Sequence, residues 1–121
     1  MITLTSDFGD SAYAGAVRGV LLARAPRARL VDVTHAIPAG DVTAGALALL
    51  AALPHFPRAN GAEPVVHLAV VDPGVGTARR GVAVQCRGTF LVGPDNGLLT
   101  PVANALGLGS VREISEPRLW N

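Results

Sequence analysis

Three aspartates are the residues of this sequence best placed to do chemistry. Asp7, Asp72 and Asp95 each come shortly after a short apolar run. In open α/β sheets ligands bind beyond the carboxyl ends of the strands, so side chains at these positions share one edge. A single aspartate of this kind is better explained by turn formation or helix capping. Three of them together favour a site at that edge.

The segment from Asp72 to Arg80 (DPGVGTARR) carries the most information about this site. Its glycines allow tight turns and close approach of a ligand, and Arg79, seven residues on, can return to pair with Asp72. The segment fails as a dinucleotide fingerprint, because Arg79 replaces the third glycine and a strand follows where a helix is required. It fails as a phosphate-binding P-loop because it has no lysine. The alternative for Arg79 and Arg80 is a solvated surface pair.

The three histidines do not predict a metal site. His35, His55 and His67 lack the spacing of metal ligands, and no HExxH or CxxC motif accompanies them. We expect structural roles for His67, which lies inside an apolar run, and for His35, at a strand end. The single cysteine, Cys86, cannot form an internal disulfide, which favours a buried side chain in a reducing compartment.

The composition fits one small globular domain and excludes several functions. The 121 residues are 50% hydrophobic with net charge +1, which rules out intrinsic disorder, and scattered arginines with 4% aromatic residues predict no nucleic-acid partner. All ten basic residues are arginine, which removes Schiff-base and lysine-base chemistry. The longest apolar run, Ala44 to Leu53, is too short to cross a bilayer, and the start lacks a signal peptide. We therefore expect a cytoplasmic protein with no membrane partner.

Six apolar runs predict the β-strands that position the site residues. The run from Val65 to Val71 suits a strand buried on both faces and is expected at the centre of the sheet. Only Arg87 and Gly88 separate two later runs, which favours an antiparallel hairpin. The expected strands cover residues 2–5, 30–33, 65–71, 82–85, 89–92 and 111–114.

Helical periodicity alternates with these runs. A first helix, ended by Pro26, has one apolar face made of Tyr13, Ala16, Val17 and Val20. A second, ended by Pro54, has an apolar stripe made of Val42, Ala46, Leu49, Leu50 and Leu53. A third is expected over residues 98–106. This alternation predicts an α/β domain, a three-layer sandwich with a mainly parallel central sheet and helices on both faces.

Five motifs, in this order, resemble the N-terminal domain of the S-adenosyl-L-methionine (SAM) hydroxide adenosyltransferases, also called SAM hydrolases. The motifs are Thr5 to Gly9 (TSDFG), Tyr13 with Gly15 and Gly19, Val31 to Pro38 (VDVTHAIP), Val71 to Thr77 (VDPGVGT) with Arg79 and Arg80, and Gly93 to Leu99 (GPDNGLL). Each is weak alone, but five in order are specific, and the resemblance runs from Ile2 to about Pro117. Ser6 stands where threonine is commoner in the family, and Gly40 where many relatives have glutamine.

The resemblance implies hydrolysis of SAM to adenosine and L-methionine by attack of water on the ribose C5′, with SAM as substrate and no cofactor or metal. It implies Asp72 and Arg79 as catalytic residues and Asp7, Phe8 and Asp72 as substrate-binding residues. Asp7 would hold the ribose hydroxyls. Arg79 stays protonated, so it would orient the water or Asp72 and could not be the base.

The resemblance also separates this chain from the related fluorinating and chlorinating enzymes. Those relatives carry a tyrosine at the position of Asp72 and a long insertion in the hairpin, where this chain has only Arg87 and Gly88. Full-length relatives are longer, with a C-terminal β-barrel domain, and form trimers. Residues 1–121 are therefore expected to be the N-terminal α/β domain of a homotrimer, without its β-barrel domain. The alternative is a non-catalytic fragment that binds nucleoside or SAM or that oligomerises.

Overall fold

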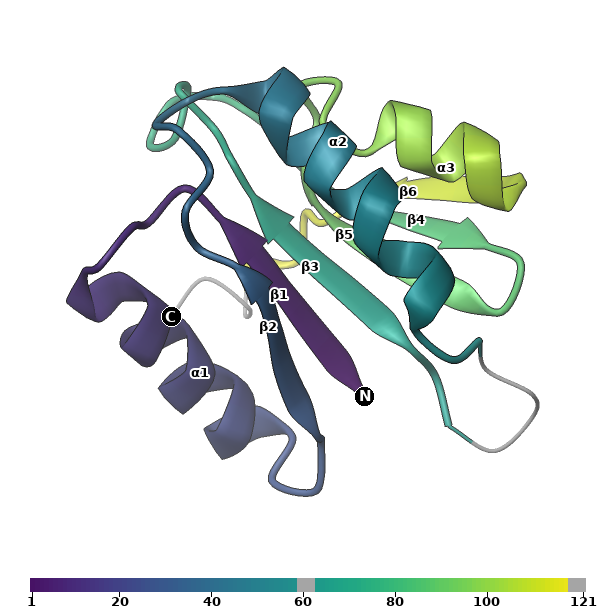
Figure 1. The fold of residues 1–121 in the computed structure, drawn as a ribbon, viewed down its shortest axis with the longest axis horizontal. Helices are drawn as coiled ribbons and strands as arrows, with labels where there is room; N and C mark the ends of the chain where they lie inside the picture. Colours follow the sequence, from purple (N-terminus) through teal and green to yellow (C-terminus); the bar gives the residue numbers. More distant parts are fainter. Residues whose placement is uncertain (59–62, 118–121) are drawn as a thin grey trace.

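The sheet and its helices follow the expected order along the chain (Figure 1). The computed structural model describes residues 1–58 and 63–117. Within these ranges the strands are β1 (Ile2–Ser6), β2 (Leu30–Thr34), β3 (Val66–Val70), β4 (Gly81–Cys86), β5 (Thr89–Pro94) and β6 (Leu108–Glu113). The helices are α1 (Ala12–Arg24), α2 (Val42–Ala52) and α3 (Thr100–Leu106), and a short 3₁₀ turn (Leu53–His55) extends α2.

The six strands form one sheet in the order β2-β1-β3-β5-β4-β6. Strands β2, β1, β3 and β5 are parallel, whereas β4 is antiparallel to both β5 and β6. The central position expected for β3 is confirmed. The expected hairpin is confirmed too, and Gly88 supplies a positive φ of 69° in its turn, a conformation that glycine adopts without steric cost.

The α/β class is confirmed, but the mainly parallel three-layer sandwich is not. The sheet is mixed, because β4, which lies beyond β5 in the sheet, pairs in antiparallel fashion with both β5 and β6. Figure 1 shows α2 and α3 together over one face of the sheet, with α1 apart from them, beside β2. Among the residues of α1 only Ala14 is buried, so this helix adds little to the core.

The core lies between the sheet and the pair α2 and α3. The stripe expected on the second helix is confirmed: Ala46, Leu49 and Leu53 are buried, and Val42 and Leu50 pack against the same cluster. Burying a leucine side chain stabilises the fold by about 1.5–3 kcal/mol. Gly45 lets α2 approach closely, because a Cβ atom there would lie 2.8 Å from Leu98 Cδ1 and 3.0 Å from Val71 Cγ2.

The apolar face expected on the first helix is wrong. Tyr13 is 71% exposed and Val20 is 64% exposed. Of the expected face only Val17 is half-buried; the less exposed side of α1 also carries Ala14, Arg18 and Leu21. The Arg18 guanidinium forms an ion pair with Asp32 of β2.

The structural role expected for His67 is confirmed. Its Nδ1 lies 2.7 Å from Thr3 Oγ1 in the interior, and burial lowers the pKa of His67 to about 4. Cys86 is a free, buried thiol whose pKa is raised by the same burial. Among the described residues, no helix has the length and apolar character needed to cross a membrane.

Candidate active site

Asp7 follows β1 and is tied to two other segments. Its backbone N–H donates to Val70 O of β3 (3.4 Å), and its Oδ2 accepts a hydrogen bond of 2.7 Å from the N–H of Gly40. Gly40 has a φ of +71°, and a Cβ atom there would lie 3.3 Å from Pro73 Cβ. The turn before α2 therefore closes over the segment that follows β3, and the half-buried Asp7 carboxylate lies where they meet.

Asp72 follows β3 and is half-buried. Its Oδ1 accepts hydrogen bonds from the N–H of Gly74 (2.9 Å) and from Asn96 Nδ2 (3.5 Å). Asn96 Nδ2 also donates to Val71 O at 2.9 Å. Sequence reasoning missed Asn96 as a site residue, and the signal that could have found it is its place in the Gly93 to Leu99 motif.

Arg79 returns to the neighbourhood of Asp72, but the expected ion pair is wrong. In the part of the chain that the structure describes, no salt bridge joins the two side chains. Arg79 Nη1 donates instead to the carbonyl oxygen of Asp95 at 3.3 Å. Both groups border Gly74, because a Cβ atom there would lie 2.8 Å from Arg79 Nη2 and 3.3 Å from Asp72 Oδ1. A small ligand or a water molecule could bridge the carboxylate and the guanidinium.

Arg80 is a solvated surface residue, which was the alternative given above for Arg79 and Arg80. It pairs with Asp95. Arg80 Nη2 lies 2.5 Å from Asp95 Oδ2, and both side chains are exposed. Arg80 Nη1 also approaches Glu113 Oε2 of β6 at 4.0 Å. The Asp95 carboxylate is thus already in an ion pair, whereas the carboxylates of Asp7 and Asp72 form none among the described residues.

The three aspartates gather at one edge of the sheet. Strands β1, β3 and β5 run parallel, so their carboxyl ends meet there. A cleft of about 470 Å³ opens at this edge, within the size range of small-molecule sites. Its lining includes Val70, Asp72, Thr77, Arg79, Val92 and Ile114. Asp7 and Phe8 are not among its lining residues and lie outside it.

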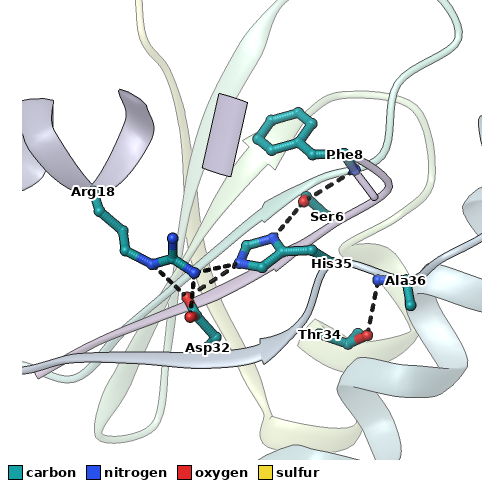
Figure 2. A network of polar contacts seen from close by, with 7 residues as sticks. All are labelled: Ser6, Phe8, Arg18, Asp32, Thr34, His35 and Ala36. Atoms are coloured by element: carbon teal, nitrogen blue, oxygen red, sulfur yellow. Dashed lines mark hydrogen bonds and ion pairs between the residues drawn. The ribbon is translucent and has the colours of Figure 1, made fainter. Parts of the chain in front are cut away.

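Phe8 is half-buried and stacks on other rings. Its ring is nearly parallel to that of His35, with an interplanar angle of 2° and a centroid distance of 6.4 Å. Tyr13 of α1 packs on it at 6.1 Å in a tilted arrangement. Figure 2 shows Phe8 beside the imidazole of His35. No group of three or more His, Cys, Asp or Glu side chains in the described ranges could hold a metal ion.

Comparisons with known proteins agree on one family. The model of the SAM hydroxide adenosyltransferase N-terminal domain matches residues 2–121. An (R)-S-adenosyl-L-methionine hydrolase of Salinispora arenicola is 48% identical over 118 residues, which are 96% of this chain and 43% of that protein. Proteins of the same name from Methanocaldococcus jannaschii and Thermus thermophilus are 41% and 53% identical, over 98% and 78% of this chain and 45% and 35% of their own.

A solved structure has the same fold. The crystal structure of an uncharacterized conserved protein from Thermotoga maritima superposes with a TM-score of 0.90 at 35% identity, covering 98% of this chain and 45% of that one. The chain therefore spans less than half the length of the relatives that it matches most fully.

Proposed function

The chain belongs to the SAM hydroxide adenosyltransferase family, and from that membership we propose that the protein hydrolyses SAM to adenosine and L-methionine. One observation carries the proposal beyond the family name. Asp72 and Arg79 both line a cleft of about 470 Å³, and both side chains lie close to Gly74. A carboxylate and a guanidinium so placed can hold a water molecule between an acceptor and a donor.

The reaction is a displacement at the ribose C5′. The water oxygen forms a bond to C5′ as the C5′–S bond breaks, and the bonding electron pair goes to sulfur, which leaves as neutral methionine thioether. A proton of the attacking water passes to Asp72 or to solvent. The sulfonium is already an activated leaving group, so the protein mainly holds the water in line, and such positioning can supply several kcal/mol of the barrier.

Asp72 and Arg79 are the catalytic residues in this proposal. Asp72 Oδ1 accepts hydrogen bonds from Gly74 and Asn96, which fixes the carboxylate in one orientation. Arg79 cannot accept a proton, so it acts as a donor to the water. Asp72 also contributes to substrate binding, because it lines the cleft.

Asp7 and Phe8 are the substrate-binding residues next to them. Asp7 Oδ2 is held by Gly40, whereas no partner of Oδ1 occurs among the described residues, so that oxygen is available to a ribose hydroxyl. Phe8 places an aromatic ring at the same edge of the sheet, where it can contact the substrate. SAM is the only small molecule that the reaction needs besides water.

We propose that residues 1–121 act as the N-terminal α/β domain of a cytoplasmic homotrimer in which a C-terminal β-barrel domain completes the site. The exposed apolar residues support self-association, since Tyr13 and Val20 of α1 and Leu108 and Val111 of β6 stay in contact with water here. Light scattering tests this, and a clean monomer at micromolar concentration would count against it.

The enzyme assay measures methionine and adenosine after incubation with SAM. The test uses this chain alone and this chain joined to the C-terminal part of the Salinispora arenicola relative. Stoichiometric release of both products supports the proposal. Adenosine binding without turnover in either form would instead assign a nucleoside-binding role. A halogenated nucleoside formed with chloride or fluoride would assign halogenation, which Asp72 and the two-residue turn at Arg87 and Gly88 disfavour.

A further inference from the structure

A chain of hydrogen bonds runs beside the proposed ribose-binding segment and is not used by the proposed reaction (Figure 2). It starts at Ser6, the last residue of β1, whose Oγ lies 2.7 Å from His35 Nδ1. It continues through His35 Nε2 to Asp32 Oδ1 at 3.1 Å. It ends on α1, where Arg18 Nε donates to Asp32 Oδ1 at 3.1 Å and Arg18 Nη2 donates to Asp32 Oδ2. Three elements, β1, β2 and α1, are joined by it.

The other partners of Ser6 and Asp32 indicate which atoms donate and which accept in this chain of hydrogen bonds. Ser6 Oγ accepts a hydrogen bond of 3.2 Å from the N–H of Phe8, so its own proton is available to His35 Nδ1. In the tautomer with the proton on Nε2, His35 donates to Asp32 through Nε2 and accepts from Ser6 at Nδ1. The Arg18 guanidinium, hydrogen-bonded to Asp32, holds the pKa of that carboxyl below its usual range, so Asp32 remains an acceptor. Arg18 Nη2 also lies 3.3 Å from His35 Nε2.

These hydrogen bonds hold the polypeptide in place on both sides of Asp7. On one side, Ser6 is bound to the imidazole of His35. On the other, the N–H of Gly9 donates to the carbonyl oxygen of the same His35 at 2.7 Å. Between them, Phe8 is held through its N–H by Ser6 and through its ring by the face of His35. Asp7 therefore belongs to a short loop whose two ends meet at one residue.

Ser6, His35 and Asp32 also have the connectivity of a nucleophile, a base and an orienting acid. The burial of Ser6 argues against that use. Ser6 is only 2% exposed, and its Oγ is already engaged by two partners. A nucleophile must reach its substrate, and this one cannot.

We propose that His35 is a positioning residue, which acts through Ser6 and Gly9 to hold the Asp7 carboxylate where it meets the ribose, with Asp32 and Arg18 locking the imidazole in place. This inference rests on the proposed function for its ligand, but the loop geometry that it invokes is a property of the free protein. The two parts can therefore be tested separately.

The chain offers a matched control in a second histidine that bonds a hydroxyl of β1. His67 Nδ1 binds Thr3 Oγ1 at 2.7 Å, so each histidine bonds one hydroxyl of β1 at the same distance. His35→Phe and His67→Phe each keep a flat ring and remove that bond. Only His35 touches the loop that carries Asp7. Ser6→Ala serves as a second, milder variant if His35→Phe does not fold.

The first measurement needs no ligand. Amide hydrogen exchange reports local opening, and we expect His35→Phe to accelerate exchange at Phe8, Gly9 and Gly40 by about tenfold relative to the core strands. Ser6→Ala should act in the same direction at Phe8. His67→Phe should leave these three amides unchanged relative to the core. Equal exchange at these amides in the parent and in His35→Phe would overturn the inference.

The second measurement is adenosine affinity by calorimetry. We expect His35→Phe to weaken binding about tenfold in the parent chain, because a misplaced carboxylate loses its hydrogen bonds to the ribose. In an Asp7→Ala background the same substitution should change affinity less than twofold, since the group it positions is gone. An undiminished tenfold loss in that background would show that His35 acts elsewhere and would overturn the inference. A parent chain that binds no adenosine would contradict the proposed function, and the exchange measurement would still decide the role of His35.

Discussion

The Asp72 carboxylate and the Arg79 guanidinium border the same glycine without forming a salt bridge with each other. A Cβ atom at Gly74 would lie 3.3 Å from Asp72 Oδ1 and 2.8 Å from Arg79 Nη2. Arg79 is held in this place by the carbonyl oxygen of Asp95 rather than by a carboxylate. Because no salt bridge joins them and both line the cleft, each keeps hydrogen-bonding capacity for the proposed water.

Substitution of Gly74 tests this arrangement directly. Gly74→Ala places a methyl group against the end of the flexible Arg79 side chain, which can move away at little cost to the fold. We expect the free energy of unfolding to change by less than about 1 kcal/mol, while SAM hydrolysis falls at least tenfold. Urea unfolding and methionine release measure the two effects.

Gly15→Ala is the matched control, because a Cβ atom at Gly15 in α1 meets nothing within 4 Å. It should stabilise the protein by about 0.5–1 kcal/mol, and the added methyl group does not touch Asp72 or Arg79. Full activity of Gly74→Ala would show that the position of Arg79 does not matter to the reaction.

Substitution of Asp72 and of Asp95 should affect SAM hydrolysis differently, although both residues follow strands that end at the same edge of the sheet. Asp72→Asn is nearly isosteric, so we expect it to keep much of the SAM affinity while turnover falls roughly 10²-fold, the scale of a lost acid–base or positioning group. Asp95→Asn removes only an exposed ion pair with Arg80 and should change either quantity little. Calorimetry and single-turnover hydrolysis check both variants. Parent-like turnover in Asp72→Asn would reduce Asp72 to a turn residue.

Gly93 is required for the packing of β5 against β3. A Cβ atom at Gly93 would lie 2.5 Å from the carbonyl oxygen of Ala69, and neither backbone can shift without breaking the sheet. We expect Gly93→Ala to destabilise the protein by about 3 kcal/mol or more, the upper end of overpacking effects. Gly19→Ala in α1, where a Cβ atom meets nothing within 4 Å, should not destabilise it. Urea unfolding measures both variants, and equal midpoints would contradict this prediction.

The buried His67 makes stability depend on pH. Burial lowers the pKa of His67 to about 4 from an ordinary value of 6.5, so between these values the unfolded chain binds more protons than the folded one. Stability should therefore rise with pH by up to about 1.4 kcal/mol per unit across that window. Below pH 4 this contribution no longer changes.

His67→Phe removes this dependence. Asp32, whose pKa is also lowered, contributes stability that is lost only on further acidification, and it is present in both proteins. The quantity to measure is the difference in unfolding free energy between parent and variant from pH 4 to 6.5. A constant difference across that range would show that His67 is protonated equally in the folded and unfolded chains.

The strands, the second helix and the edge that carries the aspartates followed from the sequence alone. Runs such as Val65 to Val71 are apolar enough to be buried whatever surrounds them, and parallel strands bring Asp7 and Asp72 to one edge as a consequence of topology. The structural role of His67 followed likewise, because a histidine inside an apolar run must find its partner in the interior. The five ordered motifs were sufficient to indicate the family.

Only the tertiary structure decided how α1 is rotated and which partners the polar side chains take. Periodicity shows which residues share a helix face but not which face turns inward: here Tyr13 of the expected apolar face is exposed, whereas Arg18 pairs with Asp32 of β2. Likewise, a spacing of seven residues brings Arg79 near Asp72 but does not choose between its carboxylate and the carbonyl oxygen of Asp95. Such choices depend on distances of a few tenths of an ångström between segments remote in the chain, which residue types and spacing do not specify.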